Sequence, residues 1–467
     1  MIRTGETICA PATSGGGAIA IIRMSGPQSI VICGRIFMPA DKKSRLSQQK
    51  GYSIIFGEIR EGDKIIDEVL VSVFRAPHSY TGEDSVEISC HASSYIQQKI
   101  LELLIKNGAI AAQPGEFTMR AFLNGKMDLS QAEAVADLVA SSSRVSHQLA
   151  MHQVRGAFSA EIVKLRKELL HFASLIELEL DFGEEDVEFA DRKDLAAIVG
   201  KVKDIADSLA SSFMIGNVVK NGIPVAIVGK PNSGKSTLLN AMLMEDKAIV
   251  SEIPGTTRDV IEDTFIIDGI EYRFIDTAGL RTTTDIIENL GIRKTHEKII
   301  QASVILLIDD VSDNAEQINR RSGKIREMIK ASGKRLFILI NKIDLASSEK
   351  LSGFKKNIIV KDNEVLLFIS AKEKIGLDEL RSQLSQVVEK EELRSDNVII
   401  TNIRHYEALL RVSESLVRVE DGLKSDIPED LIAIDIRQAT HYLGEITGEI
   451  TTDEILGNIF KNFCIGK

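Results

Sequence analysis

Apolar residues follow three different patterns along the chain, and each pattern predicts a different kind of domain. In residues 1–124, short β-rich runs such as GAIAIIRMSG and EVLVSVFRA are separated by Gly, Pro and Ser, as in a small α+β domain. Residues 115–223 contain no proline, and apolar residues recur every three or four positions in FSAEIVKLRKELLHFASLIELEL. Because proline breaks helix interiors and this spacing lines one helix face, the stretch predicts long helices.

A third pattern begins at Pro224 and predicts an inserted α/β domain. PVAIVG, YRFIDTAG, SVILLIDD, RLFILINKID and LLFISAK are continuous apolar runs separated by helical stretches, which is typical of parallel strands buried on both faces. A helical pattern returns after about residue 386 in HYEALLRVSESLVRVEDGL. The domains we expect are an N-terminal α+β domain at 1–124, an all-α domain in two parts at 125–221 and 386–467, and an α/β domain at 222–385.

The first helix of the all-α region has a recognisable start. In DLSQAEAVADLV, Ser130 and Glu133 have the spacing of a capping box, in which each side chain bonds the backbone N–H of the other residue. The sequence therefore predicts that this helix begins at Ser130.

Charge and cysteine content narrow the class of protein. A net charge of −11 over 467 residues argues against nucleic-acid binding over the whole surface, although a local basic patch or a basic partner is compatible with it. The four cysteines form no CxxC pair, which favours a reducing compartment without a disulfide framework or zinc site. No apolar run approaches the ~20 residues of a membrane span, and only a short stretch precedes the ETICAPAT run. We therefore expect a protein of the bacterial cytoplasm with no membrane partner, rather than a mitochondrial one.

The motif GKPNSGKS at 229–236 matches GxxxxGK[ST] and lies between an apolar strand and a helical stretch. This is the context of a phosphate-binding loop, in which backbone N–H groups surround the phosphates. Lys235 would reach the β and γ phosphates and is a candidate catalytic residue, whereas Ser236 would bind Mg²⁺. The inserted domain is therefore expected to be a P-loop domain.

Three further motifs follow in the order that a GTPase requires: DTAG at 276–279, NKID at 341–344 and SAK at 370–372. Asp344 would accept two hydrogen bonds from guanine that adenine does not offer, so the ordered set predicts a Ras-like GTPase domain. The residues expected around the nucleotide are Asn232, Ser233, Gly234, Lys235, Ser236, Thr237, Asp276, Thr277, Ala278, Gly279, Asn341, Lys342, Asp344, Ser370, Ala371 and Lys372.

The water-orienting residue is not evident from these motifs. Many GTPases place a glutamine directly after DxxG, but this chain has Leu280, which cannot hydrogen-bond to water. Either another residue of the next segment does this work, with Arg281, Asp285 and Glu288 as candidates, or the protein hydrolyses GTP poorly alone. Each of the three could also be a solvated loop charge.

The segment SEIPGTTRD is the second candidate for sensing the γ-phosphate. Thr257 could supply a hydroxyl to Mg²⁺, while Thr256, Ser251 and local carbonyls could surround a monovalent cation together with Asn232. A cation there would neutralise the charge that develops between the β and γ phosphates, as an arginine finger does elsewhere.

The whole chain resembles the family of tRNA-modification GTPases called MnmE or TrmE. The resemblance rests on GKPNSGKSTLLN, SEIPGTTRDV, DTAGLR, SYTGEDSVEISCH, QPGEFTMRAFLNGKMDLSQAEA and RQATHYLGEITGEITTDEILGNIFKNFCIGK. It implies a potassium-dependent GTPase that forms a homodimer through its N-terminal domain. It also implies a heterotetramer with an FAD-dependent flavoprotein, MnmG. Together they would form a 5-carboxymethylaminomethyl or 5-aminomethyl group on the wobble uridine of certain tRNAs. The one-carbon unit would come from a 5-formyl or 5,10-methylene tetrahydrofolate bound by the N-terminal domain.

The resemblance also implies roles for particular residues. It makes Glu288 the catalytic glutamate that positions water, and Ser236 and Thr257 the Mg²⁺ ligands. The implied K⁺ ligands are Asn232, Ser251, Ile253 and Thr256. The segment around the nucleotide and its cations comprises Ser251, Glu252, Ile253, Pro254, Gly255, Thr256 and Thr257. The implied folate contacts are Arg23, Glu87, Lys126 and Lys467.

From the residues alone, a carboxylate suits a pterin and a cation suits the glutamate tail of folate, but each of the four folate residues is more often an ordinary surface charge. The terminal NFCIGK has two interpretations as well. Cys464 could serve the modification chemistry, with Gly466 allowing a close backbone approach to the folate site, or it could be buried as a small apolar residue. We take the functional interpretation as the hypothesis.

Two other functions share the GTPase motifs. A regulatory switch in ribosome assembly would often carry a basic RNA-binding appendage after the GTPase domain, and the sequence after 386 has none. A membrane-remodelling GTPase would need a basic amphipathic helix or lipid anchor, which we do not find. The enzyme is therefore preferred, and the regulatory switch remains the alternative.

Overall fold

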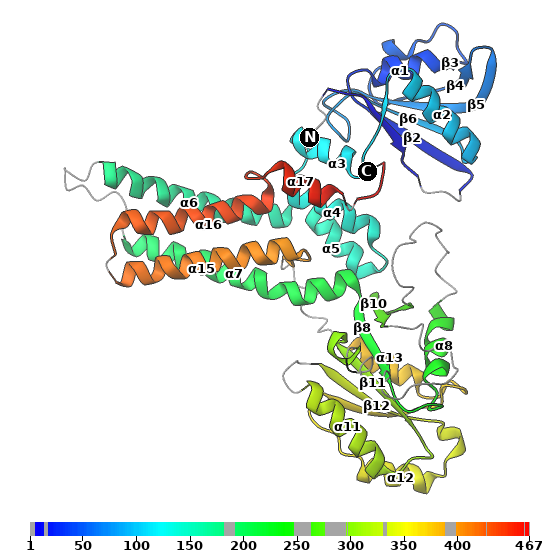
Figure 1. The fold of residues 1–467 in the computed structure, drawn as a ribbon, viewed down its shortest axis with the longest axis vertical. Helices are drawn as coiled ribbons and strands as arrows, with labels where there is room; N and C mark the ends of the chain where they lie inside the picture. Colours follow the sequence, from blue (N-terminus) through cyan, green and yellow to red (C-terminus); the bar gives the residue numbers. More distant parts are fainter. Residues whose placement is uncertain are drawn as a thin grey trace.

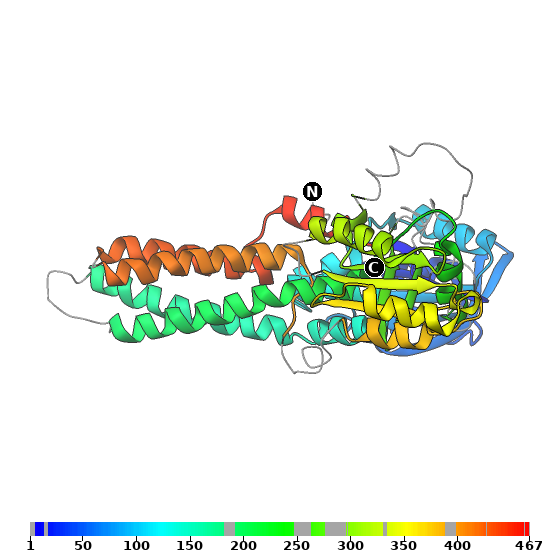
Figure 2. The same cartoon turned by 90° about the horizontal axis from the view of Figure 1, so that it is seen from below.

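The computed structural model describes residues 5–13, 17–181, 192–246, 263–275, 296, 298–329, 334–387, 398–425, 427–461 and 463–466. They form an N-terminal domain built on a sheet, a long helical bundle, and a second sheet domain (Figure 1). Both sheet domains lie at the same end of the bundle, which runs away from them in the view of Figure 2. The expected fold class, an α+β domain and an all-α domain with an inserted α/β domain, is confirmed.

The N-terminal domain is a seven-stranded sheet in the order β3-β4-β5-β6-β2-β1-β7. Its strands are β1 (Ile8–Pro11), β2 (Ile19–Ser25), β3 (Phe37–Pro39), β4 (Ser53–Glu61), β5 (Lys64–Phe74), β6 (Ser85–His91) and β7 (Ile110–Ala111). One face packs against α1 (Ser29–Ile36) and α2 (Ser94–Lys106) through alternate buried residues such as Ile22, Val71 and Ile88. The other face carries every second residue of the same strands, because side chains alternate across a strand.

The helical bundle combines segments from both sides of the insertion. Its helices are α4 (Leu129–Ala140), α5 (Arg144–Val154), α6 (Ala157–Asp181), α7 (Arg192–Asn221), α15 (Ile403–Lys424), α16 (Glu429–Thr447) and α17 (Asp453–Phe460). Helix α6 packs on α16 and α7 packs on α15. A single apolar core runs through all four, from Phe158 on α6 to Ile446 on α16. The two parts of the domain therefore fold as one body.

The start of α4 corrects the expected cap. Helix α4 begins at Leu129, with Asp128 as its N-cap and Gln131 completing the capping box. Asp128 has the extended backbone of a cap and accepts the Gln131 N–H at 2.9 Å, so the cap lies two residues before Ser130. Glu133 is instead buried and accepts hydrogen bonds from Arg404 at 2.9 and 2.8 Å. Its carboxylate ties α4 to the start of α15.

The inserted domain is a six-stranded sheet in the order β13-β12-β11-β8-β10-β9. Its strands are β8 (Ile223–Val228), β9 (Thr264–Ile267), β10 (Ile270–Phe274), β11 (Val304–Asp310), β12 (Arg335–Asn341) and β13 (Glu364–Phe368). Its helices are α8 (Lys235–Asp246), α11 (Ala315–Ile329), α12 (Ser348–Asn357) and α13 (Leu377–Ser385). The neighbouring strands pair in parallel from β13 to β10, as expected.

One edge of this sheet differs from the all-parallel expectation. Strand β9 pairs antiparallel with β10 through a tight turn at Asp268 and Gly269, both with positive φ. A two-residue turn of this kind favours Asp-Gly, since both residues need positive φ. The Asp-Gly pair in IIDGIEY is therefore the sequence signal for this hairpin. The pair lies between two apolar runs, so the pattern of apolar runs alone does not indicate an antiparallel strand.

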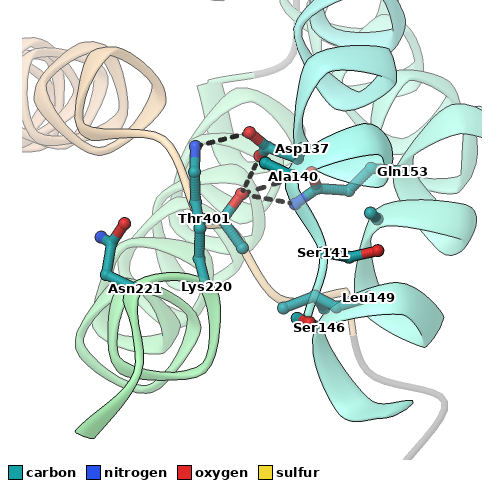
Figure 3. A pocket seen from close by; sticks show the side chains of 10 residues that line it. Asp137, Ala140, Ser141, Ser146, Leu149, Gln153, Lys220, Asn221 and Thr401 are labelled. Carbon is teal, nitrogen blue, oxygen red and sulfur yellow. Dashed lines mark hydrogen bonds and ion pairs between the residues drawn. The ribbon is translucent and has the colours of Figure 1, made fainter. Parts of the chain in front are cut away.

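The two chain connections between the bundle and the inserted domain lie side by side at a polar junction (Figure 3). Helix α7 leads directly into β8, and the chain returns to the bundle at 398–402. Lys220 of α7 pairs with Asp137 of α4 at 2.8 Å, and the Thr401 hydroxyl donates to Asp137 at 3.2 Å. The Gln153 amide of α5 donates to the Ile399 carbonyl at 3.0 Å. Both connections to the inserted domain are thus bound to α4 and α5, beside a cavity of about 90 Å³.

None of the helices in the described ranges is long and apolar enough to cross a membrane.

Candidate nucleotide site and C-terminal site

The phosphate-binding loop lies between β8 and α8, and its glycines are required by close contacts. A Cβ on Gly229 would lie 2.2 Å from the Ile308 carbonyl oxygen, and a Cβ on Gly234 would lie 2.2 Å from the Asn341 amide nitrogen. Asn232 has positive φ, a conformation that asparagine tolerates better than most residues. The loop is therefore shaped by its neighbours β11 and β12 as well as by its own sequence.

Lys235, at the first position of α8, lies over this loop. Its ammonium donates to the carbonyls of Gly229 at 3.1 Å and Lys230 at 2.7 Å. Burial lowers the pKa of Lys235, and the positive charge of Lys298 adds to the effect. Together with the N–H groups at the start of α8, this ammonium gives the loop the positive character that suits a polyphosphate.

The base-recognition motifs meet the phosphate loop through Asn341. Its side-chain amide is buried, donates to the Ser233 carbonyl at 2.9 Å and accepts the Ala371 N–H at 3.0 Å. Asp344 is exposed and accepts the Ser370 hydroxyl at 2.6 Å. The NKID and SAK motifs thus converge on one edge of the loop, whereas Lys372 lies in solvent beside Glu373.

The remaining residues expected around the nucleotide lie outside the described ranges. These are the segments 251–257 and 276–279, together with Leu280 and Glu288. Ser236 and Thr237 lie in the first turn of α8, next to Lys235. Ser236 and Asn232 therefore lie at the loop, and the other residues expected to bind Mg²⁺ or K⁺ lie beyond the described residues.

The sequence interpretation missed three contacts that hold this loop. Lys342 donates to the Asn232 carbonyl at 2.8 Å and to Asp310 at 3.0 Å, and Lys230 also reaches Asp310, at 3.3 Å. Lys230 stands in the quoted motif and Asp310 ends the run SVILLIDD. Their signal was an acidic residue at the carboxyl end of a strand, where ligand sites of parallel sheets form.

Two of the expected folate residues lie together on the sheet of the N-terminal domain. Arg23 of β2 and Glu87 of β6 are register partners and form an ion pair at 2.8 Å, each with about a quarter of its side chain exposed. The Arg23 guanidinium lies 5.6 Å from the ring centre of Tyr80 and 5.8 Å from that of Phe117. The Glu87 carboxylate can accept hydrogen bonds, the Arg23 guanidinium can donate them, and the Tyr80 ring is partly exposed, so these groups are of the kind that would fit a pterin with a glutamate tail.

Lys126 lies against the same loop that carries Tyr80. Its ammonium donates to the Pro77 carbonyl at 3.1 Å, and its side chain borders Gly82. Lys467 lies outside the described residues. Three of the four expected folate residues are therefore gathered around the segment 77–82.

The C-terminal segment after α17 reaches this cluster. The Gly115 N–H contacts the Cys464 carbonyl at 3.4 Å, and Arg23 donates to the Gly466 carbonyl at 3.3 Å. Gly466 has φ of 93°, and a Cβ there would lie 2.0 Å from the Pro11 carbonyl oxygen. The Gly466 backbone therefore closely approaches Pro11 of β1 and Arg23, which is one of the expected folate residues.

Cys464 differs from the other cysteines of the chain. Cys9, Cys33 and Cys90 are buried, and burial raises their pKa values to about 11, 12 and 11. Cys464 is exposed and lines a groove of about 580 Å³ between α4, α15 and α17. Burial as a small apolar residue therefore does not account for it.

The parallel sheet, the loop before α8 and the converging NKID and SAK motifs define a P-loop GTPase. A profile of the MnmE helical domain matches residues 129–464, and a profile of the GTP-binding protein TrmE N-terminus matches residues 7–126. The chain belongs to the MnmE family of tRNA modification GTPases.

Full-length relatives agree with this assignment. A tRNA modification GTPase MnmE of Bacteroides thetaiotaomicron is 55% identical over 465 residues, 99% of each chain. One of Christiangramia forsetii is 53% identical over 477 residues, 100% of each chain.

Among solved structures, the G domain of the T. maritima FeoB iron transporter is similar to part of this chain. The two are 26% identical, and the match covers 35% of this chain and 98% of that chain with a TM-score of 0.25.

Proposed function

We propose that this chain is a potassium-dependent GTPase that builds a 5-carboxymethylaminomethyl or 5-aminomethyl group on the wobble uridine of certain tRNAs. It would act in the bacterial cytoplasm with an FAD-dependent, MnmG-like flavoprotein in a heterotetramer. The proposal rests mainly on the C-terminal segment. Its Gly466 carbonyl accepts a hydrogen bond from Arg23, and Cys464, two residues earlier in the chain, is exposed. We keep the domain limits 1–124, 125–221 with 386–467, and 222–385.

The N-terminal domain would bind the tetrahydrofolate derivative, which supplies the one-carbon unit when bound. Glu87 would accept hydrogen bonds from the pterin, and Lys126 and Lys467 would bind the glutamate tail. Arg23 has a second task, since its guanidinium also holds the Gly466 carbonyl. The same side chain would thus orient the folate and fix the C-terminal segment.

Cys464 would be the nucleophile or acid–base group of the modification step, and this gives a test. Cys464→Ser is expected to keep normal GTP hydrolysis and to abolish wobble-uridine modification, because a hydroxyl is a far weaker nucleophile than a thiolate near neutral pH. The measurements are nucleoside mass spectrometry of tRNA from cells that carry the variant and GTP turnover of the purified protein. Ile465→Ala alters the neighbouring exposed side chain and is the matched control. Normal modification by Cys464→Ser would refute the role of the thiol.

In the GTPase domain, Lys235 would bind the β and γ phosphates, and Ser236 and Thr257 would bind Mg²⁺. Asn232, Ser251, Ile253 and Thr256 would bind K⁺, whose charge stabilises the charge developing in the transition state. Glu288 would position the attacking water, since Leu280 cannot.

The cation role predicts a difference between salts. We expect GTP hydrolysis in KCl to exceed that in NaCl of equal ionic strength by about tenfold or more, the scale of losing one electrostatic stabiliser. The advantage should disappear in Asn232→Ala, because its side chain would be a ligand. Initial rates of phosphate release over a K⁺ titration measure both effects. Equal rates in the two salts would contradict the potassium role and favour a regulatory switch that needs an external activator.

An exposed apolar surface supports the homodimer. Phe56 and Leu70 are register partners on β4 and β5, with 51% and 46% of each residue exposed, and Ile54 is 68% exposed beside them. They lie on the sheet face opposite α1 and α2, which is also the face of Arg23 and Glu87. A second copy placed on this face would cover apolar area and close the folate site from one side.

A further inference from the structure

Asp310 ends β11, the strand that pairs with the strand leading into the phosphate loop. It is only 4% exposed, and its carboxylate lies between two lysines. One oxygen is 3.3 Å from the Lys230 ammonium and the other is 3.0 Å from the Lys342 ammonium. One lysine belongs to the phosphate loop and the other to the guanine motif, so a single carboxylate joins the two ends of the nucleotide site.

The carboxylate is fixed and ionised. Its oxygen accepts the Ser312 N–H at 2.8 Å, and the Ser312 hydroxyl also donates to it. Burial opposes ionisation, but the hydrogen bonds from Ser312 and Lys342 hold the pKa of Asp310 well below its usual range. Asp310 is therefore negatively charged near neutral pH.

Both lysines connect Asp310 to the phosphate loop. Lys342 donates to the Asn232 carbonyl at 2.8 Å, so it holds the backbone in the middle of the loop. Lys230 also donates to Asp313 at 2.9 Å and to the Ser312 hydroxyl at 3.0 Å, so it holds the beginning of the loop. The loop is thus held at two points that share Asp310.

We infer that Asp310 is a positioning residue for GTP hydrolysis. Through Lys230 and Lys342 it keeps the phosphate loop in its binding conformation before GTP arrives, so that binding does not have to order the loop. Because it pairs with both lysines, Asp310 also connects the guanine motif to the phosphate loop. The inference concerns the established GTPase activity and does not rest on potassium, folate or Cys464.

A competing effect has the opposite sign. A carboxylate near the triphosphate repels it, so removing that charge alone would strengthen GTP binding. If preorganisation dominates, Asp310→Asn weakens binding, because a neutral amide holds an ammonium less well than a carboxylate does. The direction of the change in KM therefore separates the two effects.

The test compares Asp310→Asn with wild type in the full-length protein, with GTP turnover and GDP affinity measured in one potassium buffer. We expect KM for GTP and Kd for GDP to rise about tenfold, with kcat changed by less than about threefold, since the loop is ordered again once GTP is bound. Glu316→Gln is the matched control. It removes one exposed carboxylate from the first turn of α11 and leaves Asp310 between both lysines, so we expect KM to stay within about twofold of wild type.

An unchanged KM, or a lower one, in Asp310→Asn would overturn the inference. If this variant does not fold, as judged by its melting curve, the variants Lys230→Met and Lys342→Met can replace it. Each removes one of the two lysines that connect Asp310 to the phosphate loop. Both should raise KM, and Lys342→Met should raise it more because it frees the Asn232 carbonyl. Wild-type KM values in both variants would also overturn the inference.

Discussion

Replacement of Gly466 by alanine is expected to abolish tRNA modification and to leave GTP hydrolysis unchanged. The new Cβ would lie 2.0 Å from the Pro11 carbonyl oxygen, and the φ of 93° is a conformation that L side chains rarely adopt. The segment after α17 must then leave the N-terminal domain. It would separate the Cys464 carbonyl from the Gly115 N–H and break the Arg23 hydrogen bond to the Gly466 carbonyl.

The measurement is nucleoside mass spectrometry of tRNA from cells whose chromosomal copy carries the variant, with GTP turnover of the purified protein alongside. Gly457→Ala is the matched control, because it lies inside α17 and its Cβ would meet nothing within 4 Å. We expect this control to keep both activities. Full modification by Gly466→Ala would show that the contact between the two ends of the chain is not needed for the chemistry.

The described part of the nucleotide site was predictable because its parts are local in sequence. The loop motif fixes the spacing of Gly229, Gly234 and Lys235, while NKID begins at the end of the buried strand β12 and SAK follows the half-buried edge strand β13. In a parallel sheet the carboxyl ends of the strands meet at one edge. The convergence of Asn341 and Ala371 on the loop therefore follows from the order of motifs alone.

The anchor at Asp310 was not predictable in the same way. Its contacts with Lys230 and Lys342 depend on the pairing of β11 with β8 on one side and β12 on the other. Strand order is a property of the folded sheet, and continuous apolar runs carry no signal for it. The sequence showed an acidic residue at a strand end but not which cations would face it.

The ion pair of Arg23 and Glu87 joins residues that are 64 positions apart, and its geometry is set by the register of β2 against β6. Gly466 adds a partner 443 positions from Arg23. Strand pairing within the N-terminal domain sets the first contact, and packing of the C-terminal segment on that domain sets the second, so the sequence could suggest them only through the family resemblance. The cap of α4 was missed for a local reason, since both Asp128 and Ser130 are good capping residues and only backbone geometry decides between them.

Asp344→Asn is expected to change the base specificity of the enzyme from GTP to XTP. The carboxylate would accept hydrogen bonds from the N1–H and the exocyclic amine of guanine. An amide cannot accept both, so one guanine donor would face an amide N–H. The amide loses one of these hydrogen bonds and makes the other without a charge. Because each hydrogen bond to a charged group contributes about 1.5–3 kcal/mol, the two effects together give a fall in kcat/KM for GTP of at most roughly 10²–10⁴-fold. Xanthine has a carbonyl in place of the amine, and the side-chain amide of the Asp344→Asn variant can donate to it.

Steady-state kinetics with GTP and XTP on the same preparation measures this change. Ser370→Ala is the matched comparison, since the Ser370 hydroxyl only orients Asp344 through the 2.6 Å hydrogen bond. It should lower kcat/KM for GTP by about tenfold at most, the scale of one ordinary hydrogen bond, without any gain for XTP. If Asp344→Asn hydrolysed GTP as well as wild type, the guanine would have to be read by groups other than the NKID carboxylate. A loss of GTP use with no gain for XTP would point to a collapsed base site, because the exchange of one donor pattern for another requires the rest of the pocket to remain in place.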